Sequence, residues 1–269
     1  MKRVILFFVV AYLITWIIWL PLILPPFGIE VLPVIPTYHH YIGSFGPLMA
    51  AFLLTAYYDG SKGVLCLLNK LVQWNVHWVW YFIVLLVPVL LVLGAGYADQ
   101  FINDHPFSMR GFSTNNEFPG TAPLSYFLLN LFTFGIGEET GWRGFALPLL
   151  QKRFPALKAT FILSVGWALW HVPAFIYRPL YSQMNVTGMA GFFISLLMGA
   201  IVLTWLYNST KGSLIFVAVF HAMIELMFIS SNITTAMTTY MGAAIMMAAV
   251  VIVLITNSRN LSFLPRQTS

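Results

Sequence analysis

Long runs of apolar residues, separated by short polar segments, make up most of this chain. A helix that crosses the roughly 30 Å apolar layer of a bilayer needs about 20 such residues. Eight runs approach this length, some of them only with polar residues or short ends, and we expect each to cross the membrane. They cover residues 4–24, 39–58, 77–98, 124–148, 158–177, 187–207, 213–230 and 233–256. The pattern therefore predicts an all-α, polytopic membrane protein of about eight transmembrane helices.

Two segments differ from the simple pattern. Segment 39–58 is the weakest predicted span, because it begins with two histidines and a Gly-Ser-Phe-Gly-Pro kink, and it could be re-entrant. Residues 61–74 place Lys62 and Lys70 among apolar residues, which is typical of an amphipathic helix at the membrane interface. We find no internal repeat or linker, so residues 1–269 are expected to form a single integral membrane domain.

The distribution of Lys and Arg predicts the orientation. With eight spans and an inside N-terminus, only Arg110 and Arg178 fall on the outer side. The inner side holds Lys2, Arg3, Lys62, Lys70, Lys152, Arg153, Lys158, Lys211, Arg259 and Arg266. This asymmetry follows the positive-inside rule and predicts an N-in, C-in protein. A seven-span version would place one end on the wrong side. We expect a multi-pass protein of the cell membrane, in the plasma membrane of a prokaryote.

Composition excludes a soluble domain and a nucleic-acid-binding domain. The chain is 59% hydrophobic and only 8% charged, whereas a soluble domain averages about 25% charged residues. Its formal net charge of +5 is spread over short loops and is not gathered on one face. The single cysteine, Cys66, excludes an internal disulfide.

Three charged residues stand inside one predicted span. Glu138, Glu139 and Arg143 lie within 124–148. A charged side chain at the centre of a membrane helix costs about 2.5–3.5 kcal/mol even on lenient scales, so such residues indicate a functional site. Two further spans add His171, His221 and Glu225. We expect Glu138, His171 and His221 to converge on one cavity that opens toward the side rich in Lys and Arg.

Helical geometry assigns different roles to the two adjacent carboxylates. Residues four apart share a helix face, so Glu139 and Arg143 can form an ion pair. Glu138 is rotated by about 100° around the helix axis, so it points away from this pair and remains available for catalysis. His221 and Glu225 are also four apart and present an imidazole and a carboxylate on one face.

These side chains suit hydrolysis in two ways that the residues alone do not separate. A buried carboxylate and a histidine can activate a water, while a second histidine and a polar neighbour stabilise an oxyanion. Alternatively, Glu138, His171 and His221 could hold a zinc ion with its bound water. We favour the metal-free mechanism, so no cofactor is required and zinc is the alternative.

Each residue also has a purely structural interpretation. One buried Glu–Arg pair often only joins helices, and a single histidine in a span is more often a packing residue. We interpret Trp142, Trp167 and Trp170 as packing or interface residues, and His39 and His40 as solvated residues at the interface. A purely structural interpretation is weaker for six ionisable groups on three spans. Each group costs free energy inside the membrane, and only contact among the groups offsets that cost.

Taken in order, three motifs resemble those of a known family. They are Glu-Glu-x-x-x-Arg at 138–143, aromatic-x-x-x-His at 167–171 and His-x-x-x-polar at 221–225. They are similar to the motifs of the CPBP family, the CAAX-processing proteases and bacteriocin-processing enzymes also called Abi proteins. The strings Glu-Glu-Thr-Gly-Trp-Arg-Gly-Phe and Leu-Trp-His-Val-Pro resemble the prokaryotic branch. The resemblance covers about residues 124–230, which we take as the catalytic motif region.

The resemblance implies an eight-helix intramembrane endopeptidase of the glutamate-dependent type. Glu138 would activate the water with the help of His171, and the ion pair of the fourth span would support their geometry. His221 and the residue at 225 would form the oxyanion site. Two positions depart from the family pattern: Trp167 stands where Phe is usual, and Glu225 where Asn or Asp is usual. A glutamate donates a hydrogen bond to an oxyanion only when it is protonated.

Two other classes of function remain open. The same groups could form a proton relay in a transporter, although we find no broken spans at corresponding positions of two halves. The chain could also be a non-catalytic scaffold or bacteriocin-immunity protein that keeps the site without turnover. For the endopeptidase we expect a peptide or protein substrate, with or without a lipid group, and the lipid bilayer as partners, and no nucleic acid.

Overall fold

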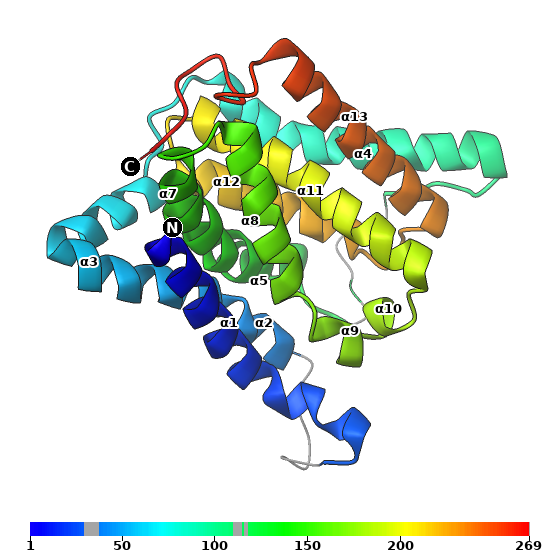
Figure 1. The fold of residues 1–269 in the computed structure, drawn as a ribbon. Coiled ribbons are helices and arrows are strands. Elements are labelled where there is room, and N and C mark those ends of the chain that lie inside the picture. Colours follow the sequence, from blue (N-terminus) through cyan, green and yellow to red (C-terminus); the bar gives the residue numbers. More distant parts are fainter. Residues whose placement is uncertain (30–37, 110–114, 116–117, 269) are drawn as a thin grey trace.

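The computed structural model describes residues 1–29, 38–109, 115 and 118–268, and Figure 1 shows their arrangement. All regular secondary structure within these ranges is helical, as the apolar runs predict. Arg110, one of the two basic residues expected on the outer side, lies outside the described residues.

The long helices follow the predicted apolar runs. They are α1 (Lys2–Ile23), α3 (Phe45–Leu71), α4 (Val79–Asn103), α8 (Ala156–Trp170), α11 (Val186–Ser209), α12 (Leu214–Phe228) and α13 (Thr235–Ile255). A further helical stretch is formed by α5 (Pro123–Asn130), η2 (Leu131–Glu138), α6 (Glu139–Gly141), η3 (Trp142–Ala146) and α7 (Leu147–Gln151). Short elements are η1 (Pro25–Phe27), α2 (His39–Gly43), α9 (Ala174–Tyr177) and α10 (Pro179–Ser182).

Four of the described helices are long and apolar enough to cross a membrane, namely α1, α4, α11 and α13. Two shorter apolar helices, α8 and α12, have 15 residues each. The structure therefore agrees with a polytopic membrane protein, while the number of eight spans and the N-in orientation stay predictions. The predicted interfacial helix at 61–74 continues α3 beyond a kink at Gly60, whose φ of 64° and ψ of −162° suit glycine.

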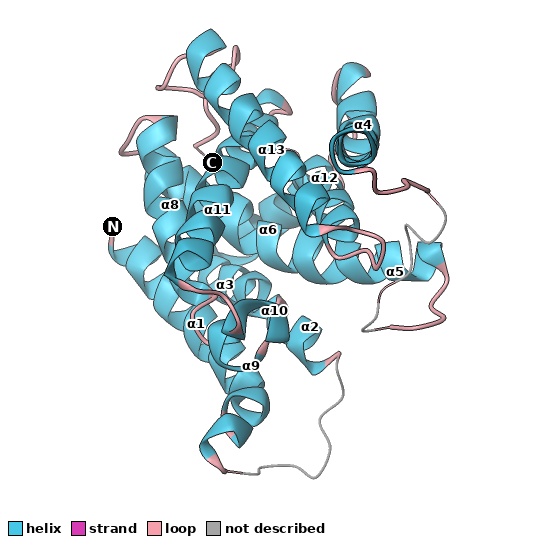
Figure 2. Cartoon of the chain, turned by 90° about the vertical axis from the view of Figure 1, so that its right-hand side faces the viewer, coloured by secondary structure: helices cyan, strands magenta, loops and turns pink. Residues whose placement is uncertain are grey.

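The stretch from α5 to α7 lies at the centre of the bundle. Helix α12 packs against η2 and α4, and α3 packs against α1, η2 and α6 (Figures 1 and 2). A Cβ on Gly135 would lie 2.6 Å from the carbonyl oxygen of Ala218, and one on Gly141 would lie 2.5 Å from Cβ of Pro47. Glycine at these two positions lets α12 and α3 approach the central stretch closely.

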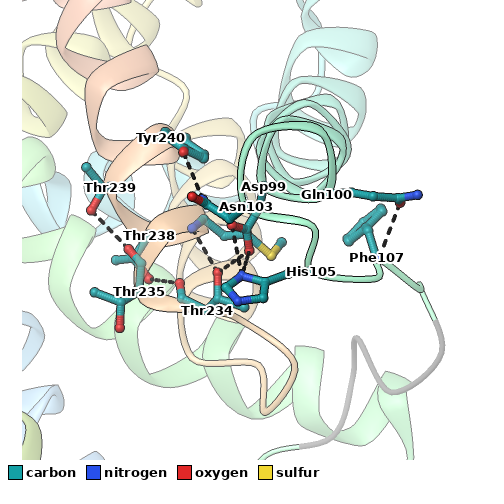
Figure 3. Close-up of polar contacts among 11 residues, drawn as sticks. Asp99, Gln100, Asn103, His105, Phe107, Thr234, Thr235, Thr238, Thr239 and Tyr240 are labelled. Carbon is teal, nitrogen blue, oxygen red and sulfur yellow. Dashed lines mark hydrogen bonds and ion pairs between the residues drawn. The ribbon is translucent and has the colours of Figure 1, made fainter.

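A buried carboxylate joins the end of α4 to the start of α13 (Figure 3). Asp99 is 1% exposed and accepts hydrogen bonds from Oγ1 of Thr234 at 2.7 Å and Nδ2 of Asn103 at 2.8 Å. Nδ1 of His105 lies 3.2 Å from the same carboxylate. Thr234 also caps α13 by accepting from the backbone N–H of Met237. Asp99 thus orders the beginning of α13 through its cap.

We predict that Asp99→Asn lowers the free energy of unfolding by about 1–3 kcal/mol, because an amide cannot accept all of these bonds. Asp104→Asn is the matched control, since Asp104 is exposed and has a φ of 55° that asparagine also tolerates. Thermal unfolding of both variants in one detergent is the measurement. Equal shifts in Tm for the two variants would contradict a structural role for Asp99.

Candidate active site

The first motif lies where the central stretch departs from α-helical geometry. Glu138 is the last residue of the π-helical segment η2, Glu139 begins α6, and Arg143 lies in the second π-helical segment, η3. All three side chains are buried, with 3% of Glu138 exposed and none of the other two. Short π-helical segments within α-helices often occur at functional sites. The three charged groups must therefore find their partners inside the protein.

The predicted ion pair is present, and it has a third member. Nη1 of Arg143 donates to Oε1 of Glu139 at 2.9 Å. Nδ1 of His221 lies 2.7 Å from the same oxygen. Because a carboxylate only accepts, His221 donates from Nδ1, so Glu139 joins the first motif to the third.

Glu138 is held by two tryptophans that we expected only to pack. Nε1 of Trp167 donates to its Oε2 at 2.8 Å, and Nε1 of Trp142 donates to the same oxygen at 3.3 Å. Both residues do pack in the interior, and each also gives its indole N–H to Glu138, because a buried N–H needs an acceptor. The spacing could have revealed Trp142, which stands four residues after Glu138. Among the described residues, the other oxygen of Glu138, Oε1, accepts no hydrogen bond.

Trp167 brings the three motifs together. Its ring lies under the guanidinium of Arg143, with Cζ 4.7 Å from the ring centroid, and meets the ring of His221 edge-on at 5.6 Å. Its carbonyl oxygen lies 2.8 Å from Nδ1 of His171. Glu138, His171 and His221 therefore each contact Trp167, while their convergence on one cavity stays a prediction.

The end of α8 determines how His171 is presented. The helix ends at Trp170, and Pro173 follows two residues after His171, so the predicted span at 158–177 is interrupted. Because the carbonyl of Trp167 can only accept, Nδ1 of His171 carries the hydrogen, and Nε2 of the neutral ring bears a lone pair. The ring packs edge-on against Trp170 at 4.8 Å and Phe192 at 5.4 Å.

Glu225 is the most accessible of the acidic groups in the site. Its side chain is 36% exposed, and its Oε1 lies 3.9 Å from Nε2 of His221, within ion-pair distance and beyond hydrogen-bond distance. The i,i+4 spacing on α12 thus produces the predicted juxtaposition.

His40 differs from the sequence-based expectation. Only 8% of this residue is exposed, its ring stacks on Trp19 at 4.9 Å, and its Nδ1 lies 2.6 Å from the hydroxyl of Tyr177. The interpretation of His40 as a solvated interface residue is therefore wrong, because α2 packs against α1 and brings it under the aromatic side chains near α9. His39 is half-buried and lies 2.6 Å from the carbonyl oxygen of Ile18.

Two further expectations concern a zinc ion at the site and the side toward which the site opens. Across the described ranges, no group of three His, Cys, Asp or Glu side chains is arranged to hold a metal ion, so Glu138, His171 and His221 do not form a ready zinc site. The predicted opening toward the side rich in Lys and Arg stays a prediction. His171 caps the C-terminal end of α8, whereas Lys152 and Arg153 precede its N-terminal end.

Comparison with known proteins bears on the same part of the chain. Residues 120–227 match the family model described as type II CAAX prenyl endopeptidase Rce1-like. This part of the chain is similar to that family. The match confirms the family resemblance inferred from the three motifs, all of which the Rce1-like region contains.

One curated protein is similar to part of this chain. CAAX prenyl protease 2 of the archaeon Methanococcus maripaludis is 32% identical over 149 residues. The alignment covers 53% of this chain and 52% of the relative, so the chain matches about half the length of this curated protein.

Proposed function

We propose that this protein is an intramembrane endopeptidase of the CAAX-protease type, which cleaves a membrane-associated peptide or protein. The observation that carries the proposal is the convergence of the three motifs around Trp167, within an Rce1-like region. Water activation requires a buried carboxylate with one oxygen that accepts no hydrogen bond from the described side chains, and a histidine with a directed lone pair. The substrate carries its scissile bond to this site from the bilayer, with or without a lipid group.

In the proposed reaction, Glu138 acts as the general base. Its Oε1 takes one proton from a water, and Nε2 of His171 accepts a hydrogen bond from the O–H that remains. The oxygen of the resulting hydroxide attacks the carbonyl carbon of the peptide bond. When the C–N bond breaks, the proton held by Glu138 passes to the leaving nitrogen. The two indole N–H groups on Oε2 keep the carboxylate oriented throughout.

His221 and Glu225 would stabilise the oxyanion. His221 donates from Nδ1 to Glu139, so its Nε2 donates to the developing negative charge only when the ring is an imidazolium. Glu139 at 2.7 Å and Glu225 at 3.9 Å both favour that positive charge. Arg143 balances Glu139 and keeps it in place.

Cleavage of a peptide by the purified protein tests the proposal. Wild-type protein is expected to cleave, and Glu138→Ala is expected to be inactive although folded. A protein that cleaves nothing and moves protons into vesicles in a Glu138-dependent way would be a transporter. A folded protein that does neither would be a non-catalytic scaffold.

We predict that Trp167→Phe lowers kcat about tenfold and leaves KM unchanged. The substitution keeps an aromatic ring beside Arg143 and removes the 2.8 Å hydrogen bond to Glu138. A hydrogen bond to a charged group contributes about 1.5–3 kcal/mol. Trp142→Phe is the matched control and should have a smaller effect, because its bond is 3.3 Å long. Steady-state kinetics of both variants are the measurement, and equal losses would show that the Trp167 bond has no special role.

We predict that activity falls on the alkaline side and that Glu225→Asn extends it to higher pH. The imidazolium of His221 can donate to the oxyanion and loses that donor when it deprotonates as pH rises, whereas an asparagine amide at position 225 donates at every pH. A pH–rate profile of wild type and variant on one peptide is the measurement. Superimposable profiles, or an inactive variant, would rule out this role. If only the variant cleaves, the natural protein is a non-catalytic member of its family.

A further inference from the structure

The C-terminal segment, residues 257–268, folds back across the end of the bundle after α13. Figure 1 shows this segment in red, running from α13 toward α7. Nδ2 of Asn208 donates to the carbonyl oxygen of Asn260 at 2.7 Å, and Nε2 of Gln151 donates to that of Gln267 at 2.6 Å. The backbone N–H of Ala156 donates to the carbonyl oxygen of Arg259 at 2.8 Å. The segment is thus attached to α7, α8 and α11.

An open cleft of about 600 Å³ lies along this segment. It is lined by Asn257, Arg259, Asn260, Pro265, Arg266 and Thr268. The side chain of Arg266 is positioned by two carbonyl oxygens, with Nε 2.8 Å from Gln151 and Nη1 3.4 Å from Arg259. A guanidinium has five N–H donors, so these bonds leave others for an anion. Arg259 is exposed at the same cleft.

The charged side chains that line the cleft are all positive. The chain contains only eight Asp and Glu residues, and none follows Glu225 or lies between residues 140 and 224. The loop that leads into α8 adds Lys152 and Arg153 beside the segment. An anion is the ligand that this cleft favours, because no acidic residue of these segments neutralises the arginines.

Apolar residues beside the cleft favour a lipid as the source of that anion. The segment begins just after α13, a helix long and apolar enough to cross the membrane, so it lies where the chain leaves the apolar layer. Phe263 is 78% exposed and Leu264 is 36% exposed, while Leu261, two residues before Phe263, is fully buried. An exposed aromatic residue between two arginines is suited to the boundary between acyl chains and headgroups.

We propose that the cleft of the C-terminal segment binds the phosphate headgroup of an anionic phospholipid. Arg259 and Arg266 contact the phosphate, and Phe263 inserts among the acyl chains. The site is separate from the candidate active site and does not depend on peptidase activity.

Lipid titration of the detergent-solubilised full-length protein, followed by native mass spectrometry, tests the proposal. Phosphatidylglycerol is expected to bind about fivefold or more tightly than phosphatidylcholine, as expected for a basic residue near an anionic headgroup. Arg259→Gln is expected to weaken phosphatidylglycerol binding about fivefold and to leave phosphatidylcholine unchanged. This residue is chosen because its side chain is exposed, whereas Arg266 also holds the segment in place.

Further controls distinguish a lipid site from unspecific electrostatic attraction and from a site for free anions. Lys62→Gln removes one positive charge from an exposed position on α3 and should leave both affinities unchanged. Phe263→Ser should weaken the binding of both phosphatidylglycerol and phosphatidylcholine. Equal effects of Arg259→Gln and Lys62→Gln would overturn the proposal in favour of unspecific attraction. Inorganic phosphate that competes as well as phosphatidylglycerol, at equal concentration, would overturn it in favour of a free-anion site.

Discussion

Glu138→Gln is expected to abolish peptide cleavage while the protein still folds. The amide has nearly the same shape as the carboxylate, and its oxygen can still accept the indole N–H of Trp167 at the position now 2.8 Å away. It cannot take a proton from water. General-base catalysis contributes about 10²–10⁴-fold, so kcat should fall by at least that factor.

Steady-state cleavage and thermal unfolding of the same preparation measure this result. Tm should lie within a few degrees of the wild-type value, since the buried group changes charge but not volume. A variant with substantial residual cleavage would exclude Glu138 as the base. A variant that loses activity only together with its fold would leave Glu138 with a structural role, contrary to the proposed mechanism.

Glu139→Ala is expected to lower both stability and activity. It removes the charged partner of Arg143, a fully buried residue whose Nε and Nη2 already have no hydrogen-bond partner among the described residues. Leaving a buried charge without its partner costs about 3–5 kcal/mol. It also releases Nδ1 of His221, which should misplace the oxyanion donor.

The double variant Glu139→Gln/Arg143→Met is the matched control for this effect. It removes both charges, and its glutamine oxygen can still accept from His221. Replacing a buried ion pair by neutral residues of similar volume is often neutral, so the double variant should recover much of the lost Tm. Equal Tm and equal residual activity for Glu138→Gln and Glu139→Ala would show that the two carboxylates do not have separate roles.

The sequence alone determined the features that depend on local order. Apolar runs predicted where the helices lie, because a helix facing lipid or core must be apolar over its length. The spacing of four residues predicted the pairs Glu139–Arg143 and His221–Glu225, because the helical repeat places such residues on one face. The motifs predicted the family, since the order of their residue types is itself a property of the sequence.

Only the tertiary structure decided which of these groups meet. Glu138 and Trp167 are 29 residues apart, and Glu139 and His221 are 82 apart, so no helical repeat relates them. The hydrogen bond from Trp167 to Glu138, the burial of His40 and the return of the C-terminal segment all follow from packing between distant helices. A helical pattern specifies the face that a residue occupies, but its partner depends on which helix covers that face, and that is a property of the whole fold.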